Sequence, residues 1–577
     1  MCPSSWIAKL IEGDECMPEY IKSDEWKDIN LEYVGENNFA SFFSSDGNLH
    51  TYPAKIVPEM ANSLLLKLKD VYKVNSVLDP FLGSGTIALE AKYLGLDFYG
   101  SDLNPLAVLL STTKAMTINN TLYIKKRILQ FTDELTKNYS KNIPFILVNF
   151  QNIDYWFQEE NIKQLSFLKY NINKFINQAT KYKKEFALIL LTAFSSTIRA
   201  SSLSRNGEFK LYRMSKNDIE KFSINSIEEF KKRSFNLLKM LVCANNTYKR
   251  DTKSEIYLEN AKELVYMKNK KVDLIFTSPP YGDSRSTVAY GEFSKLSLQW
   301  MSDLLYKYLK IETKHDNCDE YLLGGKHSIP DMCNLNGYRM QMLKNSDSLT
   351  KLFLDIEANT EKEVIMLQQE VKKLKDIQNR LVNEGTFTVS VLEENSILSN
   401  LIKTNARLFY LKQIKINPKI KEKDAKEKAK ENMAEFINSL KSMGTEEYKN
   451  SIIILKQIID RTNKALIKRI SSLPKRKLEI EKFFMDLYQV VLKTDEVINE
   501  NGIQVWIVGH RTVLGSVEVN LVDILHEWFY GLNYDKLVIM KRNYHYKRLP
   551  HHINSTFARN KKVSTMNEEH ILIVQKN

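Results

Sequence analysis

The octapeptide FTSPPYGD (Phe276–Asp283) places two successive prolines and a tyrosine after a short apolar run, Val272–Phe276. Proline has no backbone N–H, so a sheet strand is expected to end here, with rigid carbonyls and an aromatic ring beyond its carboxyl end. In open α/β sheets, that edge is where ligands bind. The Tyr281 ring could stack on a planar base while the carbonyls of Ser278 and Pro279 accept hydrogen bonds from an exocyclic amine.

An exocyclic amine is a poor nucleophile because its lone pair is delocalised into the ring. Carbonyls that accept its protons favour an sp³ nitrogen with a localised lone pair, which can attack a methyl sulfonium in line. Catalysis of this kind depends on orientation and electrostatics and needs no covalent nucleophile. None of the five cysteines lies in a Pro-Cys turn of the kind that carbon-5 methylation of cytosine requires.

A second segment with chemical potential, DPFLGSGT (Asp79–Thr86), lies earlier in the chain. Gly83 and Gly85 let the backbone approach a ligand closely and turn into a helix whose free N–H groups face that ligand. Asp102 ends the next predicted strand, where a carboxylate can accept hydrogen bonds from ribose hydroxyls. The pattern predicts a site for an adenosine-containing cofactor. It lacks the third glycine of a dinucleotide fingerprint and the GK[ST] ending of a phosphate loop.

These segments need a sheet to bring them together. Residues 76–105 are typical of a strand, a glycine-rich turn, a helix and a second strand, which is a βαβ unit with its loops at the carboxyl ends of the strands. Further strands are expected at 254–260, 272–276, 503–513, from 535 onward and at 568–577, with a helix at 521–534.

We therefore predict an α/β fold with a Rossmann-like mixed sheet of about seven strands. The sheet is expected from residues 49–110, 251–301 and 501–577, interrupted by mostly helical insertions at 111–250 and 302–500 and preceded by an N-terminal arm, 1–48. In the second insertion, apolar residues at steps of three and four indicate antiparallel helices or a short coiled coil. A helical spacer or clamp is the plainer interpretation of that region.

Composition narrows the class of protein. A chain of 577 residues is long for one core, so two or three domains are expected. The net charge of +13 favours a polyanionic partner, nucleic acid ahead of membrane, although a lysine-rich protein from an AT-rich genome would show the same excess. Five cysteines without CxxC spacing indicate a reducing compartment. With no signal peptide and no apolar run long enough to span a bilayer, we expect a cytoplasmic protein.

Taken together, these segments resemble the S-adenosyl-L-methionine-dependent DNA methyltransferases that modify amino groups. Asp79–Thr86 is similar to the family's cofactor loop, and Ser278–Tyr281 to its catalytic tetrapeptide. Tyr52–Met60 resembles the segment that precedes the cofactor loop, Ser101–Pro105 the ribose-binding strand end, and Glu259–Leu264 the adenine-binding segment. The matches cover roughly a third of the chain. The resemblance implies the class I methyltransferase sheet and S-adenosyl-L-methionine as the methyl donor.

The resemblance also assigns roles to single residues. The catalytic residues would be Ser278, Pro279, Pro280 and Tyr281. The cofactor contacts would be Tyr52, Pro53, Asp79, Pro80, Phe81, Gly83, Gly85, Thr86, Asp102, Leu103, Asn104, Asn260 and Ala261. Contacts with DNA are expected from Asp283, Arg285, Arg199, Arg205 and Arg548. Mutual pairing or helix capping explains Asp283 and Arg285 equally well. No metal is expected, because a histidine in a basic loop more readily contacts phosphate.

The first residue of the tetrapeptide bears on the target base. Ser278 is typical of cytosine-N4 enzymes of the family, whereas adenine-N6 enzymes usually have Asp or Asn there; serine also occurs among the latter. A tRNA guanine-N2 methyltransferase and a non-catalytic binding scaffold are the remaining alternatives. The expected partners are double-stranded DNA and a separately encoded restriction endonuclease. Since the chain stops soon after its last predicted strand, recognition is expected from the insertions 111–250 or 302–500. Residues 196–213 would supply Arg and Ser contacts near the active site, and residues 314–340 with the helices after them a DNA clamp.

Overall fold

The computed structural model describes most of the chain outside its N-terminal segment. The described residues are 26, 29, 31, 50, 52, 53, 56–140, 144–205, 210–248, 252–282, 289–313, 318–327, 335–383, 427, 431, 434, 435, 438, 445–514, 516–543, 552–554, 562–564 and 568–577. The chain divides into two compact units, residues 1–352 with 479–577, and residues 353–478. The predicted arm, 1–48, lies outside the described residues except at positions 26, 29 and 31.

The described strands and helices alternate from α2 to α4 and then occur in blocks. The strands are β1 (Ser76–Asp79), β2 (Asp97–Asp102), β3 (Ser254–Leu258), β4 (Val272–Thr277), β5 (Ile498–Gly509), β6 (Arg511–Val513), β7 (Val517–Val519), β8 (Tyr534–Asn543), β9 (His552–Asn554), β10 (Lys562–Ser564) and β11 (Glu568–Lys576). The helices are α2 (Pro58–Tyr72), α3 (Thr86–Leu94), α4 (Pro105–Ala115), α5 (Thr121–Ser140), α6 (Ile153–Trp156), α7 (Glu159–Gln178), α8 (Lys183–Ser201), α9 (Lys216–Glu220), α10 (Ser226–Thr247), α11 (Tyr290–Leu309), α12 (Leu335–Lys344), α13 (Asp347–Asn383), α17 (Glu446–Val497) and α18 (Leu521–Gly531).

Within the described residues, seven strands form one mixed sheet in the order β3-β2-β1-β4-β5-β11-β8. The strands from β3 to β5 run parallel, and β11 is antiparallel to both β5 and β8. Residue Leu78 of β1 pairs with Ile275 of β4, so the carboxyl ends of these neighbouring strands lie at the same edge of the sheet. The predicted α/β Rossmann-like sheet is confirmed.

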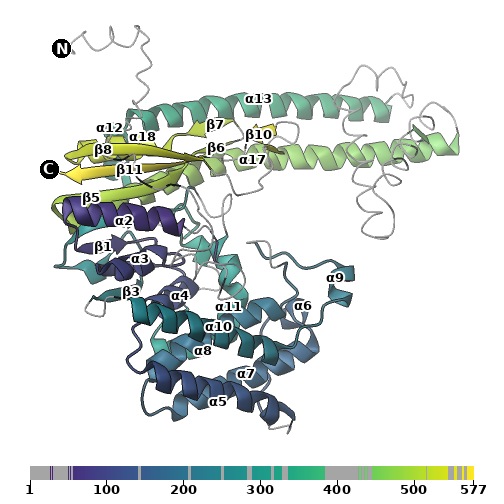
Figure 1. The fold of residues 1–577 in the computed structure, drawn as a ribbon. Helices are drawn as coiled ribbons and strands as arrows, with labels where there is room; N and C mark the ends of the chain where they lie inside the picture. The colour runs from purple at the N-terminus through teal and green to yellow at the C-terminus, as the bar shows by residue number, and fades with distance from the viewer. Residues whose placement is uncertain are drawn as a thin grey trace. The chain divides into compact units, whose positions relative to one another are not determined.

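Successive side chains of a strand point to opposite faces of the sheet. Different helices cover these two faces (Figure 1). Val505 and Ile507 of β5 belong to the apolar cluster that α2 and α3 complete on one face. Trp506 points to the other face, where its ring centroid lies 5.7 Å from that of Phe529 on α18. Strands buried on both faces read as continuous apolar runs, which is why β4 and β5 were recognisable in the sequence.

A second apolar cluster lies among α4, α5, α7, α8, α10 and α11 (Figure 1). Helix α8 is its centre, since every residue from Phe186 to Ser201 is buried. A helix that is buried on all sides lies in the interior of a bundle, and its apolar part is the FALILLTAF run, Phe186–Phe194. Residues 302–309 form the last turns of α11, which packs in this cluster.

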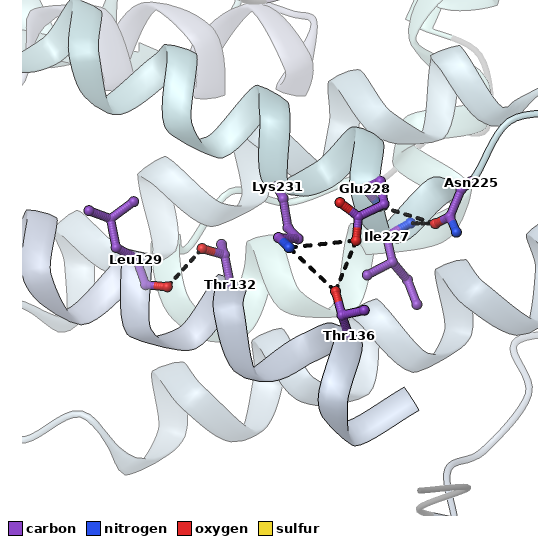
Figure 2. Close-up of polar contacts among 7 residues, drawn as sticks. All are labelled: Leu129, Thr132, Thr136, Asn225, Ile227, Glu228 and Lys231. Atoms are coloured by element: carbon purple, nitrogen blue, oxygen red, sulfur yellow. Dashed lines mark hydrogen bonds and ion pairs between the residues drawn. The ribbon is translucent and has the colours of Figure 1, made fainter. Parts of the chain in front are cut away.

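Polar contacts at the surface of this bundle join α5 to α10 (Figure 2). Asn225 caps α10, its Oδ1 accepting from the backbone N of Ile227 at 3.0 Å and of Glu228 at 3.1 Å. The Glu228 carboxylate accepts from Thr136 Oγ1 at 2.9 Å and pairs with Lys231 Nζ at 3.5 Å. The cap provides an acceptor for N–H groups that have no partner within the first turn of the helix. The negative charge of Glu228 near the N-terminus of α10 also interacts favourably with the helix dipole.

Residues 353–478, taken by themselves, contain most of α13 and the first two thirds of α17. Two ion pairs join these helices: Arg469 with Glu363, and Lys477 Nζ with Glu357 Oε1 at 2.5 Å. The partner numbers fall on α13 as they rise on α17, so the helices are antiparallel (Figure 1). This arrangement agrees with the predicted antiparallel helices. The predicted domain boundaries remain a prediction.

Two predicted elements end differently in the structure. The strand expected over 503–513 is interrupted at His510, with β6 pairing separately to β7. The helix expected over 521–534 ends at Gly531, because Asn533 has a positive φ of 68° and β8 starts at Tyr534. An Asn readily adopts this left-handed conformation, which reverses the chain tightly into the next strand.

Candidate active site

The two predicted loops start from one hydrogen-bonded pair. Strand β1 ends at Asp79 and its neighbour β4 ends at Thr277, whose Oγ1 donates to Asp79 Oδ1 at 2.7 Å. The backbone N of Phe81 donates to the same oxygen at 3.1 Å. Asp79 is buried, with 1% of its surface exposed. One carboxylate therefore ties the beginning of the glycine turn to the residue just before the tetrapeptide.

The glycine turn is shaped by contacts that only glycine allows. Gly83 and Gly85 have φ of 51° and 75°, and Gly85 precedes the first residue of α3. A Cβ on Gly85 would lie 2.5 Å from Ser111 Oγ on α4. The backbone N of Gly83 donates to Asp102 Oδ2 at 2.8 Å, so the predicted ribose-binding carboxylate also holds the turn. Thr86 begins α3 and is buried.

Burial raises the pKa of both carboxyls in this region. The pKa of Asp79 is raised to about 7, chiefly by burial, against the opposing hydrogen bonds from Thr277 and Phe81. The pKa of Asp102 is raised to about 6 by burial, against the backbone N–H groups of Asn104, Gly83 and Leu103. A cation bound at this edge would favour the ionised form of both groups.

Asn104 joins three elements beside the turn. Its side chain caps α4 by accepting from the backbone N of Leu106 at 3.0 Å. Its Nδ2 donates to Tyr52 Oη at 3.1 Å and to Ser294 Oγ of α11 at 2.7 Å. Tyr52 is buried with its ring centroid 6.0 Å from that of Tyr290. The side chain of Asn104 is thus used within the protein, and its predicted cofactor contact remains a prediction.

A cavity of about 830 Å³ opens at the carboxyl ends of β2 and β3. Leu103 and Asn260, both predicted cofactor residues, line it, and Ala261 is buried next to Asn260. Its volume is in the range of small-molecule sites. Cys318 and Tyr321, from the segment 314–340 that was predicted to contact DNA, line it too.

That cavity wall, residues 318–327, is held at two points. The Asp319 carboxylate accepts from the backbone N of Gly291 at 2.8 Å and of Glu292 at 3.0 Å, in the first turn of α11. Asp486 of α17 accepts from the backbone N of Gly324 at 2.8 Å and pairs with Lys262 Nζ at 2.8 Å. These acidic residues lie in no local motif, so only the long-range contacts reveal them.

The predicted catalytic tetrapeptide, Ser278–Tyr281, is hydrogen-bonded to a residue far along the chain. Pro279 is buried, and Ser278, Pro280 and Tyr281 are half-buried. Tyr281 Oη donates to Glu569 Oε1 of β11 at 2.8 Å and lies 3.4 Å from Ser278 Oγ. No local signal in the sequence points to that glutamate.

The predicted cofactor residues Pro53 and Pro80 are buried, and Phe81 is half-buried. Of the predicted DNA contacts, Arg199 is 9% exposed on α8, with its guanidinium 3.9 Å from the ring centroid of Phe293. Arg205 is exposed, and its backbone N donates to the carbonyl of Tyr212 at 2.8 Å. The predicted contacts Asp283, Arg285 and Arg548 lie outside the described residues.

Neither a cluster of metal ligands nor a membrane-spanning helix is found among the described residues. In that part of the chain, no group of three or more His, Cys, Asp or Glu side chains could hold a metal ion. Among the described helices, none combines the length and the apolar character needed to cross a bilayer.

Two known proteins resemble this chain in sequence. One is the Type II methyltransferase M.MvaI of Kocuria varians, 37% identical over 290 residues, which are 48% of this chain and 61% of that protein. The other is the Type II methyltransferase M.MjaII of Methanocaldococcus jannaschii, 28% identical over 95 residues, or 16% of this chain and 17% of that protein. The chain thus spans about three fifths of the first relative's length and a sixth of the second's.

No family model and no solved structure matches the chain. The sheet order, the paired loops and the similarity to M.MvaI nevertheless agree. The similarity to M.MvaI supports the resemblance to DNA methyltransferases that the motifs predicted, and the mixed seven-stranded sheet fits a Rossmann-like methyltransferase fold.

Proposed function

We propose that this protein is a DNA methyltransferase that transfers a methyl group from S-adenosyl-L-methionine to an exocyclic amine of a base in double-stranded DNA. The observation that carries the proposal is the hydrogen bond between Thr277 and Asp79. It joins the glycine turn and the tetrapeptide at one edge of the sheet, on neighbouring parallel strands. A methyl donor in one loop and an amine in the other would therefore face each other.

The residues at this edge suit S-adenosyl-L-methionine, which would supply an electrophilic methyl group. Asp102 could accept hydrogen bonds from ribose hydroxyls, since it stands where β2 ends. Leu103 and Asn260 line a cavity of about 830 Å³ that is large enough for an adenosine. When ionised, Asp79 and Asp102 would attract a cationic ligand, and such a ligand would in turn lower the pKa values that burial raises.

The tetrapeptide would bind the amine. Carbonyls of Ser278 and Pro279 can accept its protons, which localises the lone pair on nitrogen. The Tyr281 ring offers a stacking surface to a base that has left the double helix. Orientation and fixed dipoles then account for catalysis, with no covalent intermediate.

Cytosine N4 is the target that we favour, because Ser278 occupies the first position of the tetrapeptide. Adenine N6 is the alternative, and guanine N2 of tRNA a more distant one. Supporting DNA as the substrate are the net charge of +13 and the naming of both relatives as Type II methyltransferases. By the same reasoning we propose a restriction–modification role with a separately encoded endonuclease, in the cytoplasm.

The test is mass spectrometry of digested DNA from a host that lacks its own DNA methyltransferases. Expression of the full chain should produce 4-methylcytosine, and expression of Tyr281→Ala at the same level should not. Finding 6-methyladenine alone would replace the base and keep the enzyme class. Methylation of tRNA in place of DNA would move the protein to the RNA class, and no methylated product would overturn the proposal.

A further inference from the structure

Tyr281 of the tetrapeptide forms hydrogen bonds with two residues that lie more than two hundred positions later in the chain. Its hydroxyl donates to Glu569 Oε1 at 2.8 Å. Its backbone carbonyl accepts from Arg511 Nη1 at 3.1 Å. Glu569 belongs to β11 and Arg511 to β6, so the two contacts come from different elements. Tyr281 is thus restrained at its ring and at its backbone.

The glutamate is itself held in place. Its Oε2 accepts from Arg542 Nη1 at 2.7 Å, and the two residues are register partners on β11 and β8. Their side chains are only 11% and 9% exposed. Removing one member of so buried a pair would leave an uncompensated charge, so the pair is expected to stay formed. The carboxylate is therefore a rigid acceptor for the Tyr281 hydroxyl.

The Arg511 guanidinium lies close to the backbone of Gly282, the residue after Tyr281. A Cβ on Gly282 would lie 1.0 Å from Arg511 Nη1, so any other residue would displace the guanidinium. Gly282 has no positive φ that would call for glycine on its own account. A side chain at this position would therefore require the guanidinium, at the far end of the Arg511 side chain, to move away from the Tyr281 carbonyl.

We infer that Glu569 and Arg511 are positioning residues that hold Tyr281 for the proposed methyl transfer. Glu569 sets the ring orientation through the hydroxyl, and Arg511 sets the backbone next to the carbonyls of Ser278 and Pro279. Neither residue contacts the reacting atoms. This inference rests on the proposed function, since it explains how the proposed catalytic loop keeps its geometry.

The test of the glutamate is a double-mutant cycle on the full chain. Tyr281→Phe keeps the ring and removes the hydroxyl, while Glu569→Gln keeps the shape and removes the charge. Each change should lower kcat about tenfold, because small misplacements of a reacting group are costly. The Kd for S-adenosyl-L-methionine should stay within about twofold of wild type, since neither residue lies at the glycine turn. The double variant should be no slower than the slower single variant. Independent losses that multiply to about a hundredfold would overturn the inference.

The test of the arginine uses Gly282→Ala, which displaces the guanidinium and leaves its charge in the protein. Gly282→Ala and Arg511→Lys should each lower kcat, and combining them should cause no further loss. The matched control is Gly337→Ala, because a Cβ there meets nothing within 4 Å. An unchanged kcat in Gly282→Ala would overturn this half of the inference.

Hydrogen exchange of residues 278–282 separates this inference from the proposed function. Exchange in this segment should be faster in Glu569→Gln and Gly282→Ala than in wild type, whether or not methyl transfer is seen. Unchanged exchange would overturn the inference even in an active enzyme. Loss of methylation in the wild-type chain would overturn the proposed function, whereas exchange would still report whether the loop is held.

Discussion

At the scale of the residue, the buried carboxyl of Asp79 connects the glycine turn to the end of the strand before the tetrapeptide. Asp79 accepts from Thr277 at the end of β4 and from Phe81 in the glycine turn. Its pKa of about 7 leaves it partly ionised near neutrality, so its charge responds to what binds beside it. This carboxyl therefore connects the glycine turn to the residue just before the tetrapeptide.

Substitutions at the two half-sites should have separable effects. Tyr281→Ala should keep the affinity for S-adenosyl-L-methionine and lose turnover by about 10²-fold or more, because the stacking surface for the base is gone. Asp102→Ala should weaken cofactor binding by about 1.5–3 kcal/mol, the usual value of hydrogen bonds to a charged group. Calorimetry and single-turnover assays measure the two effects. The reverse pattern would show that the half-sites are assigned the wrong way round.

Cofactor affinity and protein stability should respond oppositely to pH. Affinity for the cationic cofactor should rise between about pH 5 and 8, as Asp102 and then Asp79 ionise. Both native pKa values exceed the ordinary value of 3.8, so the native state binds more protons than the unfolded state between about pH 4 and 7. The stability that these groups contribute is therefore complete below about pH 4 and is lost as pH rises through 6 and 7.

Calorimetric titrations and thermal unfolding of the cofactor-free protein over this pH range check both signs. Asp79→Asn should flatten the upper part of each profile, because its amide does not titrate. Profiles that are unchanged in this variant would show that other groups control the pH dependence.

At the scale of the element, α3 and α4 meet at the glycine turn. Gly85 combines a φ of 75° with a Cβ position 2.5 Å from Ser111 Oγ. An alanine there would adopt a left-handed conformation and also push α4 away from α3. The turn and the packing of the two helices are therefore one structural unit.

Gly85→Ala should lower the free energy of unfolding by about 2 kcal/mol or more, for both of these reasons. Gly85→Ala combined with Ser111→Gly should recover the packing part of that loss and leave the conformational part. Gly337→Ala, in open space within α12, should be neutral or slightly stabilising. Chemical denaturation measures all three. A cost at Gly85 no larger than at Gly337 would contradict the role given to the turn.

Patterns of residues close in sequence predicted most strands of the sheet and the two loops of the candidate site. Gly83, Gly85 and Asp102 lie in one βαβ unit, and the tetrapeptide directly follows a buried strand, so spacing alone indicated them. Glu569 and Arg511 could not be predicted, because they contact Tyr281 from 288 and 230 positions away. Contacts of this separation depend on strand order, which periodicity does not reveal.

At the scale of the whole molecule, charge is the property that bears most on the partner. Lysine and arginine outnumber acidic residues to give +13, which favours a polyanion without defining where it binds. Several basic residues are already used inside the protein, as with Lys262 at Asp486 and Arg542 at Glu569. Pairs of this kind cancel in the net charge, so the excess of +13 comes from the other basic residues.

Binding of double-stranded DNA should therefore depend steeply on salt, while binding of S-adenosyl-L-methionine should not. Each phosphate that a basic side chain neutralises contributes about −0.9 to the slope of log K against log salt concentration. Fluorescence anisotropy with duplex DNA from about 50 to 200 mM salt measures that slope. A slope near zero would mean that the positive charge plays no part in binding DNA.

Strand β11 lies between β5 and β8 in the sheet and carries Glu569, whose carboxylate accepts a hydrogen bond from the Tyr281 hydroxyl. Residues from 568 onward must therefore be synthesised before the sheet can close. A chain that lacked this strand would carry its glycine turn and its two prolines and yet have no carboxylate partner for the Tyr281 hydroxyl.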